Sequence, residues 1–533
     1  MSLVRNTLVQ ASLTLGSRVL GFARDLALNH RFGQGPLMDA FTTALMFPNL
    51  FRRLFAEGAF AAAFVPVYGK ARVEAGEEAA ARQASEAMTF VCFAVAGFSI
   101  AAQIAMPLLM PILLSAYAED PAMMRIATLL TQLAMPYLAC MTLASLLSGV
   151  LNTHKKFALA AGAPILLNIC TLATLLAFSE PRAAVIATAA AVSLAGVLQA
   201  GLLWWAVARL GVRLRLGLPK LTATVKTTLA LAVPGALSGG AFQLNSLVSQ
   251  LLTGADEGAR SVLYNADRLY QLPLGLVGVA IGLALVPRLT RFYALDDQSA
   301  AREAMDSGIG LAMALTMPAA LALLVMPFFI IDATVTRGAF TSADAARTAE
   351  VLRHFAWGVP AFVLVKVLTP PYFARQDTKS PMRFALATVG ISTVAGALLF
   401  LLLPRLGVDG VVGLAIATSA TAWINVGLLA RGLAQRGVYV LGAAVWGRLS
   451  RIGLASLVMA GAIGAAAFAY QTHRAEIAAI TFAKEGAILA AALGGMLIYA
   501  LAALLLRAVR PGELRSALRR EAGAPGVRGD SEF

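Results

Sequence analysis

Apolar segments of about 20 residues follow one another along nearly the whole chain, with short polar loops between them. An α-helix needs about 20 residues to cross the hydrocarbon core of a bilayer. The pattern therefore predicts an all-α integral membrane protein with 14 transmembrane helices. Their approximate ranges are 5–31, 37–67, 86–115, 122–151, 157–178, 183–208, 222–253, 260–287, 307–331, 348–373, 382–403, 410–430, 449–470 and 485–506.

The same landmarks occur twice along the chain. Pro136 matches Pro360 and the loop 152–157 matches 376–381, while further proline pairs keep a displacement of 220 to 225 residues. Six predicted helices separate equivalent landmarks, so both copies keep one orientation in the membrane. We expect two six-helix lobes related by a pseudo-two-fold axis, followed by two extra helices. The predicted parts are 1–215, 216–440, the extra helices 441–507 and a basic cytoplasmic tail 508–533.

The composition supports a membrane location. Hydrophobic residues make up 59% of the chain, charged residues only 13%, and the mean hydropathy is +0.76, whereas soluble domains carry about 25% charge. The net charge is +15, yet no basic polar domain suited to nucleic acid is visible. With the N-terminus in the cytoplasm, 27 basic residues fall on the cytoplasmic side and 10 on the outer side. The positive-inside rule then predicts that both termini are cytoplasmic.

Enzyme and metal chemistry have little support in the sequence. The cysteines Cys92, Cys140 and Cys170 lie in apolar stretches without metal-ligand spacing, and the four histidines are scattered. No HExxH, GxxxxGK[ST] or GxSxG motif occurs, and no predicted span holds two carboxylates away from its ends. We therefore expect a transporter without a cofactor or metal site, rather than an enzyme.

Six basic residues fall inside the predicted spans and away from their ends, and these charges are the functional signal. They are Arg18, Arg24, Arg52, Arg53, Arg268 and Lys366. Each costs about 2.5–3.5 kcal/mol at the centre of a membrane helix, which structure alone rarely requires. Only Asp25, Glu57 and Asp267 lie in the same spans and away from their ends as candidate partners, which leaves a formal surplus of +3.

A purely structural role has different support for each of these residues. Arg53 and Glu57 are spaced i, i+4 and can pair on one helix face, which leaves Arg52 without an evident partner. Lys366 can extend towards the membrane surface or balance a carboxylate. The remaining arginines favour a functional role, because guanidinium groups match phosphate or carboxylate oxygens two at a time. Several guanidiniums in a central cavity predict an anion carrier that works by alternating access.

Five strings along the chain carry a resemblance to a known family. They are SRVLGFARD at 17–25, FPNLFRRLFAEGAFAAAFVP at 47–66, LNTHKKF at 151–157, YNADRLYQLPLGLVGVAIG at 264–282 and RQDTKSP at 375–381. In this order they resemble the MurJ/MviN family of lipid II flippases, within the superfamily of multidrug, oligosaccharidyl-lipid and polysaccharide exporters.

The resemblance implies a bacterial cytoplasmic-membrane protein that moves the peptidoglycan precursor lipid II, an undecaprenyl-diphosphate-linked disaccharide pentapeptide, to the outer leaflet. It implies that Arg18, Arg24, Arg52 and Arg268 bind the diphosphate. It also implies a groove for the lipid tail along the two extra helices. Three acids also match family positions and are expected to be gate or positioning groups: Asp25, Asp39 and Glu57.

The expected partners are lipid II and membrane lipids, with the cell-wall or division machinery as a further candidate, and we expect a monomer. The membrane potential is the expected energy source, and the coupling ion stays open. A sodium site is not carried over, because the seventh predicted span holds Gln243 and Asn245 but no acidic residue. The alternatives are a flippase for another undecaprenyl-diphosphate-linked oligosaccharide, of the O-antigen or capsule type, and a drug antiporter. A membrane glycosyltransferase and a channel have less support.

Overall fold

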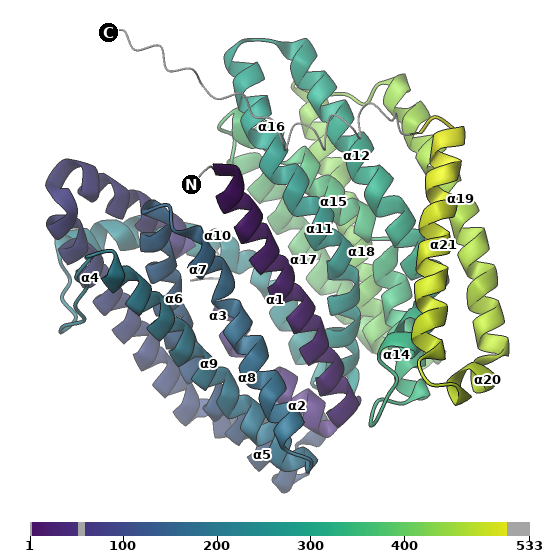
Figure 1. Ribbon diagram of the computed structural model, residues 1–533, viewed down its shortest axis with the longest axis horizontal. Helices are drawn as coiled ribbons and strands as arrows, with labels where there is room; N and C mark the ends of the chain where they lie inside the picture. Colours follow the sequence, from purple (N-terminus) through teal and green to yellow (C-terminus); the bar gives the residue numbers. More distant parts are fainter. Residues whose placement is uncertain (1–2, 52–58, 509–533) are drawn as a thin grey trace. The chain divides into compact units, whose positions relative to one another are not determined.

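The computed structural model describes residues 3–51 and 59–508, and these residues form helices without any strand (Figure 1). Helices of the first half are α1 (Leu3–Phe32), α2 (Pro36–Ala44), α3 (Met46–Phe51), α4 (Ala59–Leu113), η2 (Ser115–Tyr117), α5 (Pro121–Ala134), α6 (Pro136–Thr153), α7 (Phe157–Gly162), α8 (Pro164–Ala177), α9 (Pro181–Arg209) and α10 (Ala223–Thr253). Those of the second half are α11 (Ala259–Ala294), α12 (Gln298–Val325), α13 (Pro327–Thr334), α14 (Ser342–Ala356), α15 (Val359–Leu368), α16 (Pro370–Ala374), α17 (Lys379–Leu402), η3 (Leu403–Leu406), α18 (Gly410–Gln435), α19 (Ala443–Thr472), α20 (Arg474–Ala479) and α21 (Ala483–Leu505).

The predicted second helix, 37–67, is wrong as a single element. It is divided into α2, α3 and the start of α4. Pro48 lacks the N–H that would bond to the carbonyl of Ala44, and the helix is interrupted at Leu45. The predicted loop between the second and third spans is also wrong, because helical residues run through it: α4 is 55 residues long and consists of two helices that meet at a kink. That stretch is rich in the helix formers alanine, glutamate and arginine, and Gly76, at φ 82°, bends the helix within it.

Prolines divide other predicted spans into shorter helices. Pro136 separates α5 from α6, and Pro164 separates α7 from α8. The predicted span 348–373 becomes α14, α15 and α16. Proline removes one backbone donor and disfavours helical geometry in the residue before it. The spans keep their predicted positions, but their helices are broken.

A matching turn supports the sequence repeat. Lys155 and Gln376, 221 residues apart, both have φ of 60°. In each case the next residue donates its N–H to the carbonyl five positions back: Lys156 to Leu151 and Asp377 to Tyr372, both at 2.9 Å. The local structure therefore aligns Lys155 with Gln376, three positions before the lysine matched from the sequence.

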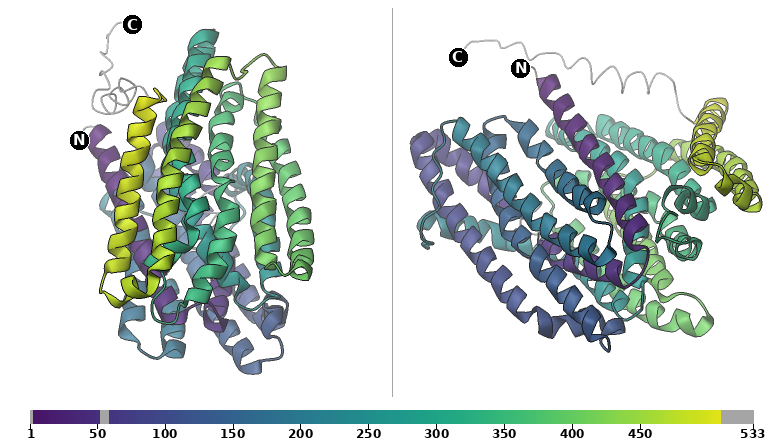
Figure 2. Two further views of the ribbon diagram at one scale, coloured as in Figure 1. Left: turned by 90° about the vertical axis from the view of Figure 1, so that its right-hand side faces the viewer. Right: turned by 60° about the horizontal axis from the view of Figure 1, so that its bottom comes forward.

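The helices cluster into two compact units, which we describe separately. Unit 1 contains Met1–Asp267, Thr334–Val351 and Ala385–Thr418. In it, α9 packs against α5, α6 and α8, and α4 packs against α6 and α10 (Figure 2). Two apolar clusters fill unit 1, one around Met88 and Leu147 and the other around Met110 and Leu130.

Unit 2 contains Arg268–Ala333, Leu352–Phe384 and Ser419–Phe533. Helix α12 packs against α15 and α19, and α19 runs beside α21, the yellow helix of Figure 1. A core around Leu289, Ile309 and Ile452 joins these helices. The boundaries of the predicted lobes at 215 and 440 stay a prediction.

Ten helical stretches of the described residues are long and apolar enough to cross a membrane. They are Phe64–Leu113, Pro121–Thr153, Phe157–Ala177, Pro181–Ala208, Gln298–Val325, Ser342–Ala374, Lys379–Leu406, Gly410–Gln435, Ala443–Thr472 and Ala483–Leu505. Each coincides with a predicted span. The other four crossings, at 5–31, 37–67, 222–253 and 260–287, stay predictions, although α1, α10 and α11 are helical there.

Gly33→Ala should destabilise the protein by about 2–3 kcal/mol. Gly33 ends α1 at φ +62°, and an alanine Cβ would lie 2.4 Å from the carbonyl oxygen of Ala339. Gly407→Ala is the matched control, because Gly407 has φ +74° but no atom within 4 Å of the added carbon. The melting temperature of each purified variant measures the effect. Equal losses in both would contradict the steric argument.

Candidate functional site

Arg24 and Asp25, adjacent on α1, form a largely buried ion pair in unit 1. Arg24 Nη2 lies 2.7 Å from Asp25 Oδ1, and the two side chains are only 12% and 13% exposed. Arg24 Nε donates to the same oxygen at 3.1 Å, and Tyr264 Oη donates to it at 3.0 Å. The guanidinium is therefore held in one orientation by its neighbour in the chain. This pairing was not expected, because adjacent residues point in different directions around a helix.

Amide side chains tie α1 to two other helices of unit 1. Arg24 Nη1 donates to Asn168 Oδ1 of α8 at 3.2 Å, and Asn168 Nδ2 donates to the Ser17 carbonyl at 2.9 Å. Asn29 and Asn265 exchange hydrogen bonds at 2.8 and 2.9 Å. Sequence reasoning missed these partners because it searched for charges. Uncharged amides within apolar helices were the available signal.

Asp39 lies on α2 and is buried, with its carboxylate against the start of α11. Its carboxylate accepts from the Gly258 N–H at 2.8 Å, from the Ser261 N–H at 2.9 Å and from Tyr117 Oη at 2.9 Å. An acid placed at these backbone N–H groups caps the N-terminus of α11 and complements its dipole. The structure thus gives Asp39 a positioning contact, and none of these three donors belongs to a predicted arginine.

Arg260, the first residue of the predicted span 260–287, is only 3% exposed. Its Nη2 donates to the Leu113 carbonyl at 2.7 Å and to the carbonyl of Gln250, and its Nη1 donates to Thr43 Oγ1. Backbone carbonyls, which no sequence pattern reveals, therefore accept from Nη2 of this guanidinium, whereas its buried Nε has no hydrogen-bond partner among the described residues. Arg260 joins α2, α4 and α10 around the buried Asp39.

The remaining predicted residues are not brought together in one described cluster. Arg18, two turns before Asp25 on α1, is exposed, and Arg268 is exposed on α11. Lys366 is half-buried on α15. Arg52, Arg53 and Glu57 lie outside the described residues. Convergence of Arg18, Arg24, Arg52 and Arg268 on one anion therefore stays a prediction.

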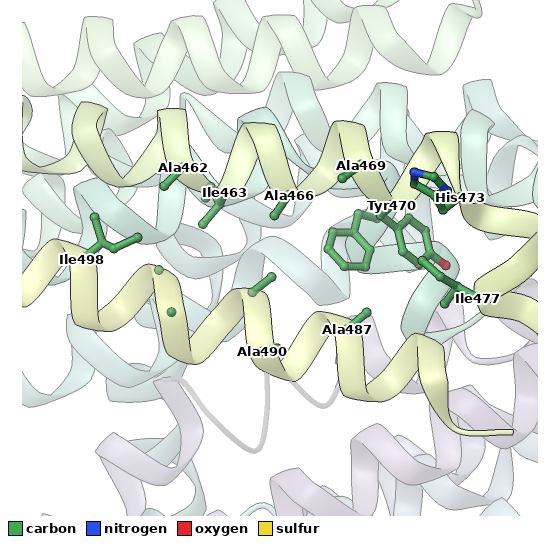
Figure 3. A pocket seen from close by; sticks show the side chains of 14 residues that line it. Ala462, Ile463, Ala466, Ala469, Tyr470, His473, Ile477, Ala487, Ala490 and Ile498 are labelled. Atoms are coloured by element: carbon green, nitrogen blue, oxygen red, sulfur yellow. The ribbon is translucent and has the colours of Figure 1, made fainter. Parts of the chain in front are cut away.

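Unit 2 contains an apolar cavity of about 620 Å³ between α19 and α21 (Figure 3). Small side chains line both helices, among them Ala462 and Ala466 on α19 and Ala490 and Gly494 on α21. Tyr470, which stacks on Phe329 with ring centroids 4.0 Å apart, lines the cavity together with His473. The small residues leave the space into which a long apolar chain would fit.

A charged cluster adjoins this cavity through Tyr470. Asp332 of α13 is fully buried and accepts from Arg474 Nη2 at 2.8 Å, Lys484 Nζ at 3.3 Å and Tyr470 Oη at 2.6 Å. Burial opposes ionisation of Asp332, but these donors and the two positive charges lower its pKa to about 2. The cluster fixes the connection between α19 and α21 to α13. No group of three or more His, Cys, Asp or Glu side chains able to hold a metal occurs in residues 3–51 and 59–508.

The fold is that of a multi-pass membrane transporter. A solved structure described as a lipid II flippase MurJ in an inward closed conformation matches with a TM-score of 0.75 and 23% identity, covering 94% of this chain and 99% of that one. An inward-facing MATE family multidrug transporter of the MOP superfamily matches with a TM-score of 0.63 and 14% identity, over 80% and 98% of the two chains. At these identities the likeness concerns the fold alone.

Comparison with sequence relatives identifies the family. The family model described as lipid II flippase MurJ matches residues 28–484. A probable lipid II flippase MurJ of Rhizobium tropici is 36% identical over 98% of both chains, and one of Rhizobium meliloti is 38% identical over 87% of this chain and 86% of its own. The chain belongs to the lipid II flippase MurJ family. It is thus a multi-pass protein of the bacterial inner membrane and a member of a transporter family rather than an enzyme family.

Asp332→Asn should lower the stability of the protein by about 2 kcal/mol at neutral pH, since one pKa unit corresponds to about 1.4 kcal/mol. A carboxyl whose pKa is depressed on folding stabilises the protein above its unfolded pKa, near 4, and loses that contribution as the pH falls towards 2. The melting temperatures of wild type and variant should therefore converge between pH 5 and about pH 2. Glu303→Gln, at an exposed position of α12, is the control. A difference independent of pH would contradict the ion-pair argument.

Proposed function

We propose that this chain carries lipid II from the inner to the outer leaflet of the bacterial cytoplasmic membrane. The observation that carries the proposal is the family match over residues 28–484, together with relatives named lipid II flippase MurJ that align along nearly their whole length. Lipid II presents a diphosphate, a glycan with a peptide, and an undecaprenyl tail. The three parts require a cationic site, an aqueous cavity and an apolar groove.

The diphosphate is proposed to bind Arg24 together with Arg18, Arg52 and Arg268. Arg24 supports this role because Asp25 and Asn168 hold its guanidinium within the apolar helices, ready to receive phosphate oxygens. An arriving diphosphate would compete with Asp25 for the guanidinium. Asp25 therefore acts as a positioning group that keeps Arg24 compensated while the site is empty.

Transport is proposed to proceed by alternating access of two six-helix lobes, with both termini in the cytoplasm and a single chain as the working unit. The sequence repeat and the matching turns at Lys155 and Gln376 support the two lobes. The membrane potential supplies about 2.3 kcal/mol per elementary charge per 100 mV, which is enough to bias a charged carrier.

The undecaprenyl tail is proposed to lie along α19 and α21. The cavity of about 620 Å³ between these helices supports this assignment, because alanine, glycine and isoleucine form most of its lining. An apolar chain in this cavity would lie mainly against apolar side chains, with Tyr470 and His473 at one end of the lining.

Arg24→Ala and Arg268→Ala should each abolish lipid II transport, because each removes a guanidinium that meets the diphosphate. Transport is measured as lipid II exposed on the outer leaflet of cells depleted of their own flippase and supplied with the variant. Arg125→Ala, at an exposed position of α5, is the matched charge-loss control. Normal lipid II externalisation by both variants at wild-type expression would make these arginines structural.

The affinity of the purified protein for different lipid-linked oligosaccharides distinguishes the alternative substrates. Lipid II should bind more tightly than an undecaprenyl diphosphate that carries an O-antigen type oligosaccharide. The reverse preference would favour the alternative flippase, and transport of cationic drugs without lipid II binding would favour the antiporter.

Ala466→Phe should reduce lipid II transport by filling the cavity between α19 and α21. Ala465→Phe is the matched control, because the neighbouring residue is exposed and does not line the cavity. The affinity of each variant for lipid II and for a short-tailed analogue is then compared. We expect Ala466→Phe to lower the affinity for lipid II but not for the short-tailed analogue. Equal affinities of the two variants for lipid II would contradict a tail site in this cavity.

A further inference from the structure

The segment 209–226, which we call the connector, joins α9 to α10 and carries an unusual concentration of positive charge. Its basic residues are Arg209, Arg213, Arg215, Lys220 and Lys226. No acidic residue occurs between Glu180 and Asp256, so nothing within the connector offsets these charges. The proposed function uses none of them.

All five basic side chains are exposed, and none of them makes an ion pair or a hydrogen bond with the described residues. Arg209 lies over the ring of Trp205, with its Cζ 4.3 Å from the ring centroid. Elsewhere on the surface, basic residues such as Arg72 and Arg436 pair with acids. The connector therefore presents positive charge that is available to an anionic partner.

The connector is fixed against α4 by its backbone and by one hydroxyl. Arg215 N donates to Ser85 Oγ at 3.0 Å and Gly217 N donates to Thr89 Oγ1 at 3.3 Å. Thr222 Oγ1 donates to Glu86 Oε2 at 2.8 Å. Because these bonds already order the main chain, the connector backbone loses little conformational freedom when a ligand binds.

A cavity of about 280 Å³ lies where the connector meets the end of α9. Its apolar side comes from Trp204, Val207 and Val212, and its polar side from Arg213 and Arg215. The candidate membrane span of α9 ends at Ala208, so the cavity lies at the level where a helix leaves the bilayer. Tryptophan is enriched at this level of membrane proteins.

Three leucines of the connector are exposed beside its charges. Leu216, Leu218 and Leu221 are 46%, 80% and 56% exposed. Leucines in such a position are favoured when they enter the hydrocarbon of a lipid leaflet, while neighbouring arginines and lysines contact the headgroups. A free phosphate ion would explain the arginines but not the leucines.

We propose that the connector binds an anionic phospholipid of the adjoining leaflet, with the lipid phosphate between Arg213 and Arg215 in the cavity at the end of α9. The leucines contact the acyl region, and Trp204 contacts the glycerol and upper acyl carbons. Juxtamembrane basic residues contribute to the binding of anionic lipids individually, so Lys220 and Lys226 add to the attraction. The inference does not rest on the identity of the transported lipid.

The test compares the double variant Arg213→Gln/Arg215→Gln with wild type in nanodiscs of phosphatidylcholine that contain a small fraction of phosphatidylglycerol with brominated acyl chains. In wild type, the brominated lipid should quench tryptophan fluorescence at low mole fraction. Loss of two arginines should raise the mole fraction of brominated phosphatidylglycerol that gives half of the maximal quenching by about tenfold to thirtyfold. All proteins compared carry phenylalanine in place of the exposed Trp205, Trp423 and Trp446. In this background Trp204→Phe should remove a large part of the quenching, since Trp204 lines the cavity.

The charge control is Arg291→Gln/Arg302→Gln, which removes two exposed arginines of α11 and α12. This variant should behave as wild type. Glycerol phosphate at millimolar concentration should leave the quenching unchanged if the ligand is a lipid, whereas full competition would identify a soluble phosphate site and overturn the proposal. The proposal would also be overturned if the connector variant and wild type were quenched at the same mole fraction of brominated phosphatidylglycerol. Equal quenching of wild type by brominated phosphatidylcholine at that mole fraction would overturn it as well. Lipid II binding, measured on the same samples, reports separately on the proposed function.

Discussion

An ionised group among apolar helices must be compensated by nearby donors or opposite charges, and this constraint organises the described structure. Asp25 compensates Arg24, three donors surround Asp39, and two cations together with a tyrosine surround Asp332. Each compensated group lies where helices distant in the sequence meet. The charges therefore specify which helices pack together, while the abundant leucine and alanine fill the remaining volume without such selectivity.

The positions of the long helices could be predicted from the sequence because apolar length is a strong signal. The interruptions of these helices were harder to predict, since a proline such as Pro136 breaks a helix while the apolar segment around it continues. The single helix predicted at 37–67 was wrong for this reason. The two helices that meet at Gly76 in α4 were missed because a polar stretch was equated with a loop, although its residues favour helix.

The candidate site was only partly predictable. The sequence singled out Arg24 because a guanidinium in an apolar helix is conspicuous. It could not reveal that Asp25, next to it, would be a partner, because this depends on side-chain rotamers and on Tyr264 and Asn168. Arg260 was not singled out, since the Leu113 carbonyl to which it donates belongs to a residue far along the chain. Contacts of this kind arise only when the tertiary structure forms.

The length of α4 has a mechanical consequence. Its 55 residues correspond to a path of about 80 Å, made of two helical segments that meet at Gly76, where φ is 82°. A side chain at this position would meet no neighbouring atom within 4 Å. The Arg72–Glu77 ion pair, at 2.7 Å, joins the two segments across the bend. The direction of the second segment therefore depends on one backbone conformation and on the ion pair that spans it.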